Sequence, residues 1–65
     1  MTPAAFTQWL ADIQSAGLAR SEFHALQQLG YTSRRSGANL KRSGGTVQLA
    51  LACAALIAGI KPYGE

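Results

Sequence analysis

Apolar side chains recur at helical spacing near the start of the chain. In residues 3–16, Phe6, Leu10 and Ile13 are three or four positions apart, which is the period of a helix with one buried face. Gly17 follows directly, and glycine is the residue that most often ends a helix. The pattern therefore predicts a first helix over residues 3–16 whose apolar face lies in a core.

A second apolar stripe with the same period follows. Phe23, Leu26 and Leu29 are each three positions apart, and Gly30 comes directly after them. This arrangement predicts a second helix over residues 20–29, again with one inner face.

The stretch after this helix is polar and basic. Ser33 or Thr32 can cap a third helix over residues 33–42. Gly37 lies inside that helix, where glycine costs about 1 kcal/mol relative to alanine. Glycine is tolerated where the backbone lies close against another surface, and our hypothesis is that this surface is a DNA groove.

The last helix is apolar on almost every side. Ser43-Gly44-Gly45 is expected to form a flexible break, and Gln48 is the one polar residue between the capping Thr46 and residue 58. This stretch of residues 46–58 is well short of the roughly 20 residues that span a bilayer. A helix of this kind is buried on more than one side, either wholly in a core or with one face in its own domain and the other against a second subunit. The thin core and the many small residues favour the second subunit. The residues expected at that interface are Val47, Leu51, Ala54, Ala55 and Ala58.

Together these patterns predict an all-α fold, a compact four- to five-helix bundle in a single domain. A chain of 65 residues, of which 48% are hydrophobic and 14% charged, folds but has a thin core. Cys53 is the only cysteine, which excludes an internal disulfide and a conventional zinc site. Homodimerisation through the C-terminal helix is the expected supplement to stability. We see no secretory signal, so a cytoplasmic protein is expected.

Charge placement indicates the partner. Four of the six basic residues fall between positions 34 and 42, where the sequence has no acid, and the net charge is +3. Such clustering is the electrostatic footprint of a phosphate-binding surface. The chain has no carboxylate pair, no Cys/His couple and no phosphate-binding Gly-rich loop, and His24 is expected on the surface. We therefore expect no enzyme activity, no cofactor, no metal and no small-molecule substrate.

Two segments resemble a known family. The run from Leu29 to Ser36, LGYTSRRS, resembles the turn and the start of the recognition helix in the lambda-repressor-like (Xre-type) helix-turn-helix family. The segment from Thr46 to Leu56 is similar to the closing helix of short phage and prophage members, including regulators that accompany anti-CRISPR genes. With the opening MTPAAF, the resemblance covers nearly the whole chain.

The resemblance implies a sequence-specific transcription regulator, in most cases a repressor, that binds double-stranded DNA. The third helix would enter the major groove, with Arg34 and Arg35 on guanine and Asn39 on adenine or phosphate. Lys41 and Arg42 would contact the DNA backbone. Two copies would bind a pseudo-palindrome with half-sites about one helical turn apart. The expected DNA-binding residues are Ser33, Arg34, Arg35, Ser36, Asn39, Lys41 and Arg42.

Two other functions fit the same residues. A small helical homo-oligomer could keep this fold and use its basic face to bind an acidic protein, because a fold does not fix a function. The second function, a membrane-associated peptide, is disfavoured. Such peptides carry basic and apolar residues on opposite faces of one helix, whereas in this chain the basic and the apolar residues occupy separate segments.

Overall fold

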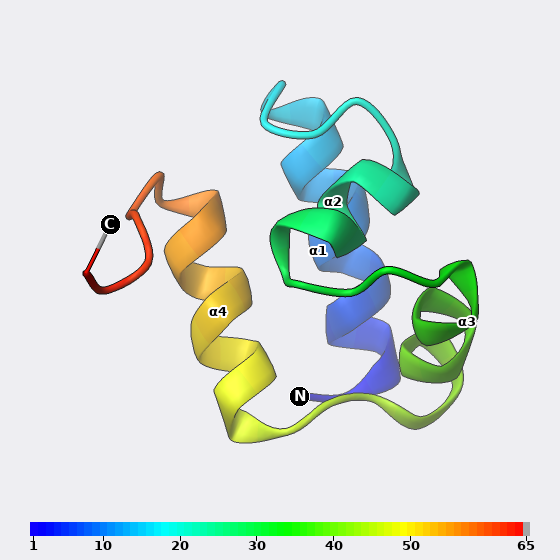
Figure 1. The fold of residues 1–65 in the computed structure, drawn as a ribbon. Coiled ribbons are helices and arrows are strands. Elements are labelled where there is room, and N and C mark those ends of the chain that lie inside the picture. Colours follow the sequence, from blue (N-terminus) through cyan, green and yellow to red (C-terminus); the bar gives the residue numbers. More distant parts are fainter. Residues whose placement is uncertain (65) are drawn as a thin grey trace.

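Four α-helices follow one another along the chain (Figure 1). The computed structural model describes residues 1–64, and this part of the chain contains helices and no strand, which confirms the predicted all-α fold. The helices are α1 (Pro3–Ser15), α2 (Glu22–Gln28), α3 (Arg34–Ser43) and α4 (Val47–Ile57).

A hydroxyl side chain starts each helix. Such a cap accepts one of the backbone N–H groups that have no partner in the first helical turn. Ser21 caps α2 by accepting the His24 N–H at 3.1 Å, which is why α2 begins two residues later than the sequence predicts. The four capping residues are Thr2, Ser21, Ser33 and Thr46.

The core is built around α1. Phe6, Leu10 and Ile13 are at most 2% exposed, and α1 packs against all three other helices. Leu26 of α2 and Leu49 of α4 belong to the same core. The radius of gyration is 10.8 Å, close to the roughly 11 Å of a compact domain of this length.

Trp9 ties α4 to α1. Its ring is 6% exposed and stacks on Phe6, with the ring centroids 5.9 Å apart. The indole Nε1–H donates a hydrogen bond to the carbonyl of Cys53 at 2.9 Å. A buried tryptophan needs such a partner for its N–H, and here that partner fixes the position of α4.

The α3–α4 connection is held in place, so the prediction of a flexible break there is wrong. The Gly45 N–H donates to the Met1 carbonyl at 2.9 Å, and the Met1 amino group donates to the Gly45 carbonyl at 3.0 Å. Gly44 has φ +77° and lies against the Met1 carbonyl and Pro3, where a Cβ would collide. Glycine is needed at this position both for its backbone conformation and for the close approach.

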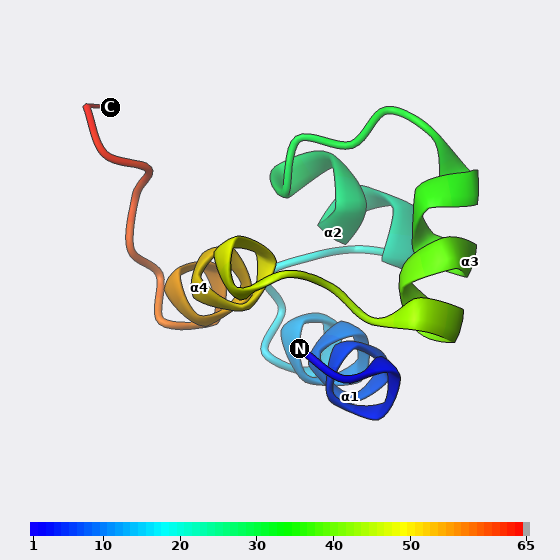
Figure 2. The same ribbon diagram turned by 90° about the horizontal axis from the view of Figure 1, so that it is seen from below.

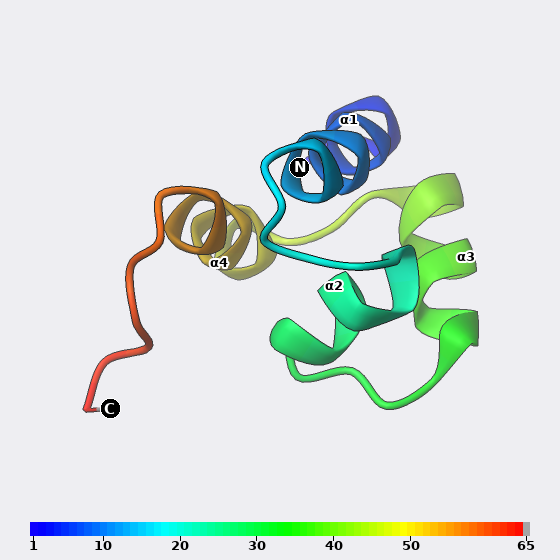
Figure 3. The ribbon, with the colours of Figure 1, turned by 90° about the horizontal axis from the view of Figure 1, so that it is seen from above.

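α3 and α4 lie at opposite ends of the molecule. In Figure 1 α4 is on the left and α3 on the right, and the views from below and above in Figures 2 and 3 keep α1 and α2 between them. The principal extents are 30 × 23 × 20 Å. Any surfaces on the outer sides of these two helices are therefore separated by the core.

Candidate nucleic-acid interface

α3 is a polar helix with one buried edge. Gly37 is buried and Leu40 is half-buried, and α3 packs against α1 and α2. All four basic residues of α3 are exposed. The helix therefore turns Gly37 and Leu40 inward and its charges outward.

Gly37 makes room for α2. A Cβ on Gly37 would lie 2.8 Å from Cδ1 of Leu26, a side chain that is itself 3% exposed. Since Gly37 is buried by its own chain, the hypothesis that this glycine admits a DNA groove is wrong. The close surface that requires glycine is the second helix.

Two of the four basic side chains turn toward α2. The guanidinium carbon of Arg34 lies 4.6 Å from the ring centroid of Phe23, a cation–π contact. Lys41 Nζ lies 2.6 Å from Oε2 of Glu22 in an ion pair whose side chains are 40% and 52% exposed. Solvent-exposed pairs of this kind contribute about 0–1 kcal/mol, so a stronger anion can displace the glutamate.

These contacts lie at the edge of a shallow cleft between α2 and α3. Its volume is about 250 Å³, and one acidic and two basic side chains stand at its rim. The floor is apolar and includes Gly37. The lining residues are Glu22, Phe23, Leu26, Arg34, Gly37, Ala38 and Lys41.

The other polar residues form a free face on α3. Arg35, Asn39 and Arg42 are exposed and spaced four and three positions apart, which places them on one side of a helix. Arg42 Nη2 donates to Oδ1 of Asn39 at 3.0 Å. We call these three residues the outer face of α3.

The two predicted serines lie at the edge of this face. The Ser33 hydroxyl accepts the Arg35 N–H at 3.2 Å and so caps α3. Ser36 is half-buried. Of the seven predicted DNA-binding residues, three therefore form the outer face, two point to α2, one caps the helix and one is partly covered.

Sequence reasoning missed Glu22 and Phe23 as neighbours of the basic cluster. The sequence pattern places Phe23 on the inner face of its helix and gives no sign of a partner for Glu22. Nineteen positions separate Glu22 from Lys41, and no local signal pairs them. The basic cluster, free of acids along the sequence, acquires one acid through folding.

His24 lies on the surface, as expected, and is half-buried there. Its Nδ1 accepts the backbone N–H of Arg20 at 3.0 Å, and its Nε2 lies 3.5 Å from Nε2 of Gln28. The imidazole thus holds the chain that enters α2. Among the described residues, no group of three or more His, Cys, Asp or Glu side chains could hold a metal ion.

A second exposed surface lies on α4. Within one chain, Leu49 and Cys53 are the buried residues of this helix, whereas Val47 is 71% and Leu51 is 65% exposed. Helical geometry places Val47, Leu51, Ala54 and Ala58 on the side opposite the core, at steps of three and four residues. We call these four residues the α4 stripe; all of them are exposed.

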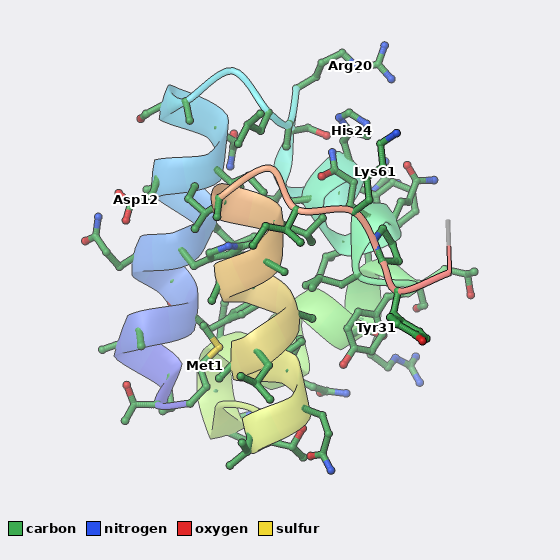
Figure 4. All side chains as sticks on the ribbon, turned by 90° about the vertical axis from the view of Figure 1, so that its left-hand side faces the viewer. Met1, Asp12, Arg20, His24, Tyr31 and Lys61 are labelled. Carbon is green, nitrogen blue, oxygen red and sulfur yellow. The ribbon has the colours of Figure 1, made fainter. Side chains whose placement is uncertain are left out.

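Ala55, the fifth residue expected at the interface, lies elsewhere. It is half-buried and lines an apolar groove of about 240 Å³ between the end of α2, α4 and the tail. Figure 4 looks at the α4 end of the molecule, with Lys61 on the tail that follows the helix. Ala55 therefore lies beside the stripe and is not part of it.

Comparison with known proteins gives no match to this chain among family models, curated proteins or solved structures. The helices within residues 1–64 are too short or too polar to cross a membrane.

Proposed function

We propose that this protein binds double-stranded DNA through the outer face of α3 and acts as a transcription regulator, forming a homodimer through the α4 stripe. The observation that carries the proposal is the gathering of Arg35, Asn39 and Arg42 on one exposed side of a helix. A short helix, a five-residue connection and a capped basic helix also follow the order of a helix-turn-helix.

The outer face has the chemistry of base readout. An arginine side chain can donate two hydrogen bonds to N7 and O6 of guanine, and an asparagine side chain can donate to N7 of adenine and accept from its N6 amino group. α3 has 10 residues and is therefore about 15 Å long, and a helix of this size enters the major groove. Arg35 and Asn39 stand where these base edges would be within reach.

Arg34 and Lys41 suit phosphate contacts instead. Both lie at the margin of α3 that faces α2, so they would meet the DNA backbone beside the groove. Contacts to phosphate position a protein without reading sequence. Covering a promoter in this way would repress transcription.

The test is binding of a fluorescent mixed-sequence duplex at a series of salt concentrations. Replacing Arg35 or Arg42 by glutamine should lower the affinity by about fivefold or more, because each change removes a contact worth about 1–3 kcal/mol. It should also reduce the slope of log K against log salt by about 0.9 if the lost contact was to phosphate.

Lys61→Gln is the matched control. It removes the same single charge from an exposed position on the tail, on the α4 side of the molecule. Its effect should stay within about twofold, as expected of a screened distant charge. If the Lys61 and Arg35 substitutions lower the affinity equally, the interaction depends on net charge alone. If the protein does not bind duplex even at low salt, the proposal is refuted. In that case an acidic protein becomes the best candidate for a partner of α3.

A further inference from the structure

The cleft between α2 and α3 combines an apolar floor with a charged rim. Leu26 and Gly37 in its floor are buried, and its volume is about 250 Å³. The two helices pack side by side, as Figures 2 and 3 show. Binding sites for small molecules are mostly apolar with a few polar groups, and those for drug-sized ligands have volumes of about 300–1,000 Å³. The cleft therefore has the character of a site for a smaller ligand.

The rim carries one charge that the fold does not neutralise. Lys41 and Glu22 neutralise each other, with Nζ 2.6 Å from Oε2. Within residues 1–64 the guanidinium of Arg34 has no carboxylate at ion-pair distance. Its neighbour is the ring of Phe23, whose centroid lies 4.6 Å from the guanidinium carbon. With two basic side chains and one acidic side chain at the rim, the cleft has one positive charge in excess.

The contact with Phe23 prepares Arg34 to bind an anion. A guanidinium group has five N–H donors, and a cation–π contact leaves donors available. Phe23 is half-buried and restrains the arginine side chain, so less conformational entropy is lost when a ligand binds. Arginine and carboxylate commonly form two parallel hydrogen bonds. Arg34 is therefore placed to hold a carboxylate at the rim.

We propose that this cleft binds a small aromatic monocarboxylate, whose carboxylate pairs with Arg34 and whose ring lies over the floor. A single carboxylate matches the one excess charge, whereas a phosphate group carries close to two. The side chains of the floor form no hydrogen bonds, so a sugar or a peptide backbone placed there would lose those that it makes with water. An aromatic ring has no such groups and gains a contact with Phe23.

The bound carboxylate also affects the proposed DNA contact. This step rests on the proposed function, in which Arg34 contacts phosphate beside the major groove. Arg34 cannot give the same N–H groups to the ligand and to phosphate, and the negative charge of the ligand repels phosphate. The ligand is therefore an effector that weakens duplex binding, and the duplex weakens ligand binding by the same factor.

The probe is 2-naphthoate, and its binding is followed by NMR of the isotope-labelled full chain. The amide signals of Phe23 and Ala38 should shift, with a dissociation constant of about 1 mM or lower, as expected for a ligand of this size. Acetate, which lacks the ring, and 2-naphthamide, which lacks the charge, should each bind at least tenfold more weakly. Shifts centred on Ala55 and Ile60, which line the second apolar groove, would overturn the proposal.

Arg34→Gln should weaken naphthoate binding about tenfold, because the charge-assisted hydrogen bonds are lost. Arg34 is exposed, so the fold should be unaffected, which the NMR spectrum checks. Arg20→Gln is the matched control, since it removes the same group from an exposed position outside the cleft. Its affinity for naphthoate should stay within twofold of wild type. Equal losses in the two variants would mean that naphthoate responds to net charge and not to the cleft.

The effect on DNA is measured with a fluorescent duplex at saturating naphthoate, against the same concentration of acetate. The affinity of wild type for the duplex should fall about threefold, as expected for the loss of one exposed ion pair, and that of Arg34→Gln should not change. An unchanged wild-type affinity, or an equal fall in Arg34→Gln, overturns the effector role. If naphthoate binds in the cleft but no duplex binds, the site stands and the proposed function fails. If duplex binds but naphthoate does not, the cleft proposal fails and the proposed function stands.

Discussion

α3 and α4 are similar in length, 10 and 11 residues, but they are attached to the molecule differently. α3 packs against both α1 and α2 through a buried glycine and keeps its charges outside. α4 packs mainly on α1 through Leu49 and Cys53 and leaves apolar side chains outside. Two helices of one small domain thus present surfaces of opposite chemistry.

This difference indicates a division of roles. An exposed face that is basic and polar suits a polyanion, and an exposed face that is apolar suits another apolar face. The variants below first test how α4 is attached and then how α3 is attached. If α4 proves to be as firmly held as α3, the two helices differ only in the chemistry of their exposed faces.

The largest effect should come from the thiol at the centre of the α4 contact. Burial raises the pKa of the Cys53 thiol from 9.0 to about 11, because the thiolate is poorly solvated there. The unfolded chain releases this proton at lower pH than the folded chain does. The protonated thiol therefore makes its full contribution to the free energy of unfolding below pH 9. This contribution, about 3 kcal/mol, is lost as the pH rises to 11.

Urea denaturation at pH 8 and at pH 10.5 measures about 2 kcal/mol of this loss, because pH 10.5 is still below the raised pKa. Cys53→Ala is the control, since alanine at this position has no proton to release and the rest of the chain is unchanged. The stability of the variant should fall less over this pH interval than that of wild type. Identical pH dependence in the two proteins would mean that Cys53 does not hold its proton more tightly in the fold.

The hydrogen bond from Trp9 is the second test of the α4 attachment. Trp9→Phe removes the indole N–H that donates to the Cys53 carbonyl at 2.9 Å and leaves space beside the ring. The expected cost is about 2 kcal/mol, from a lost buried hydrogen bond together with lost packing. Hydrogen exchange should localise the effect: amides of α4 should exchange faster than those of α3. A uniform change across the chain would contradict a local attachment.

Patterns of neighbouring residues in the sequence predicted the helices, but they did not predict contacts between residues that are far apart in the chain. The caps at Ser33 and Thr46 belong to the same turn as the N–H groups that they accept, so sequence alone sufficed to place these helix starts. Gly37 and Leu26 meet only when two helices pack, and Gly45 meets Met1 across the whole length of the fold. Both glycines were therefore given wrong roles, a DNA contact and a flexible break.

The same limit applies to the candidate site. The four basic residues of α3 could be found from their clustering, whereas their division into an outer face and a side that faces α2 depends on where α2 lies. Arg34 and Lys41 look equivalent to Arg35 and Arg42 in the sequence. Only the contacts with Phe23 and Glu22 distinguish them.

Gly37→Ala tests how α3 is attached. Alanine gains about 1 kcal/mol of helix propensity, but its Cβ would lie 2.8 Å from Leu26 Cδ1, and overpacking costs about 1–3 kcal/mol. We expect a net loss of about 1 kcal/mol in thermal or urea denaturation. In a Leu26→Ala background, where the opposing side chain is gone, the same change should be stabilising. Destabilisation in both backgrounds would show that another contact requires this glycine.

The smallest effect concerns the ion pair between α2 and α3. Glu22→Gln removes the carboxylate that lies 2.6 Å from Lys41 Nζ, at a cost to stability within the 0–1 kcal/mol typical of exposed pairs. If Lys41 contacts phosphate, its ammonium group must break the ion pair with Glu22 in the wild type but not in the variant. The affinity for duplex should therefore rise about threefold, which corresponds to less than the 1 kcal/mol upper value for an exposed ion pair. Asp12→Asn is the matched control, because Asp12 is exposed on α1 and its side chain is hydrogen-bonded to Gln8 rather than to a basic residue. An equal gain from both substitutions would assign the effect to net charge, whereas a gain confined to Glu22 would show that α2 competes with DNA for the basic margin of α3.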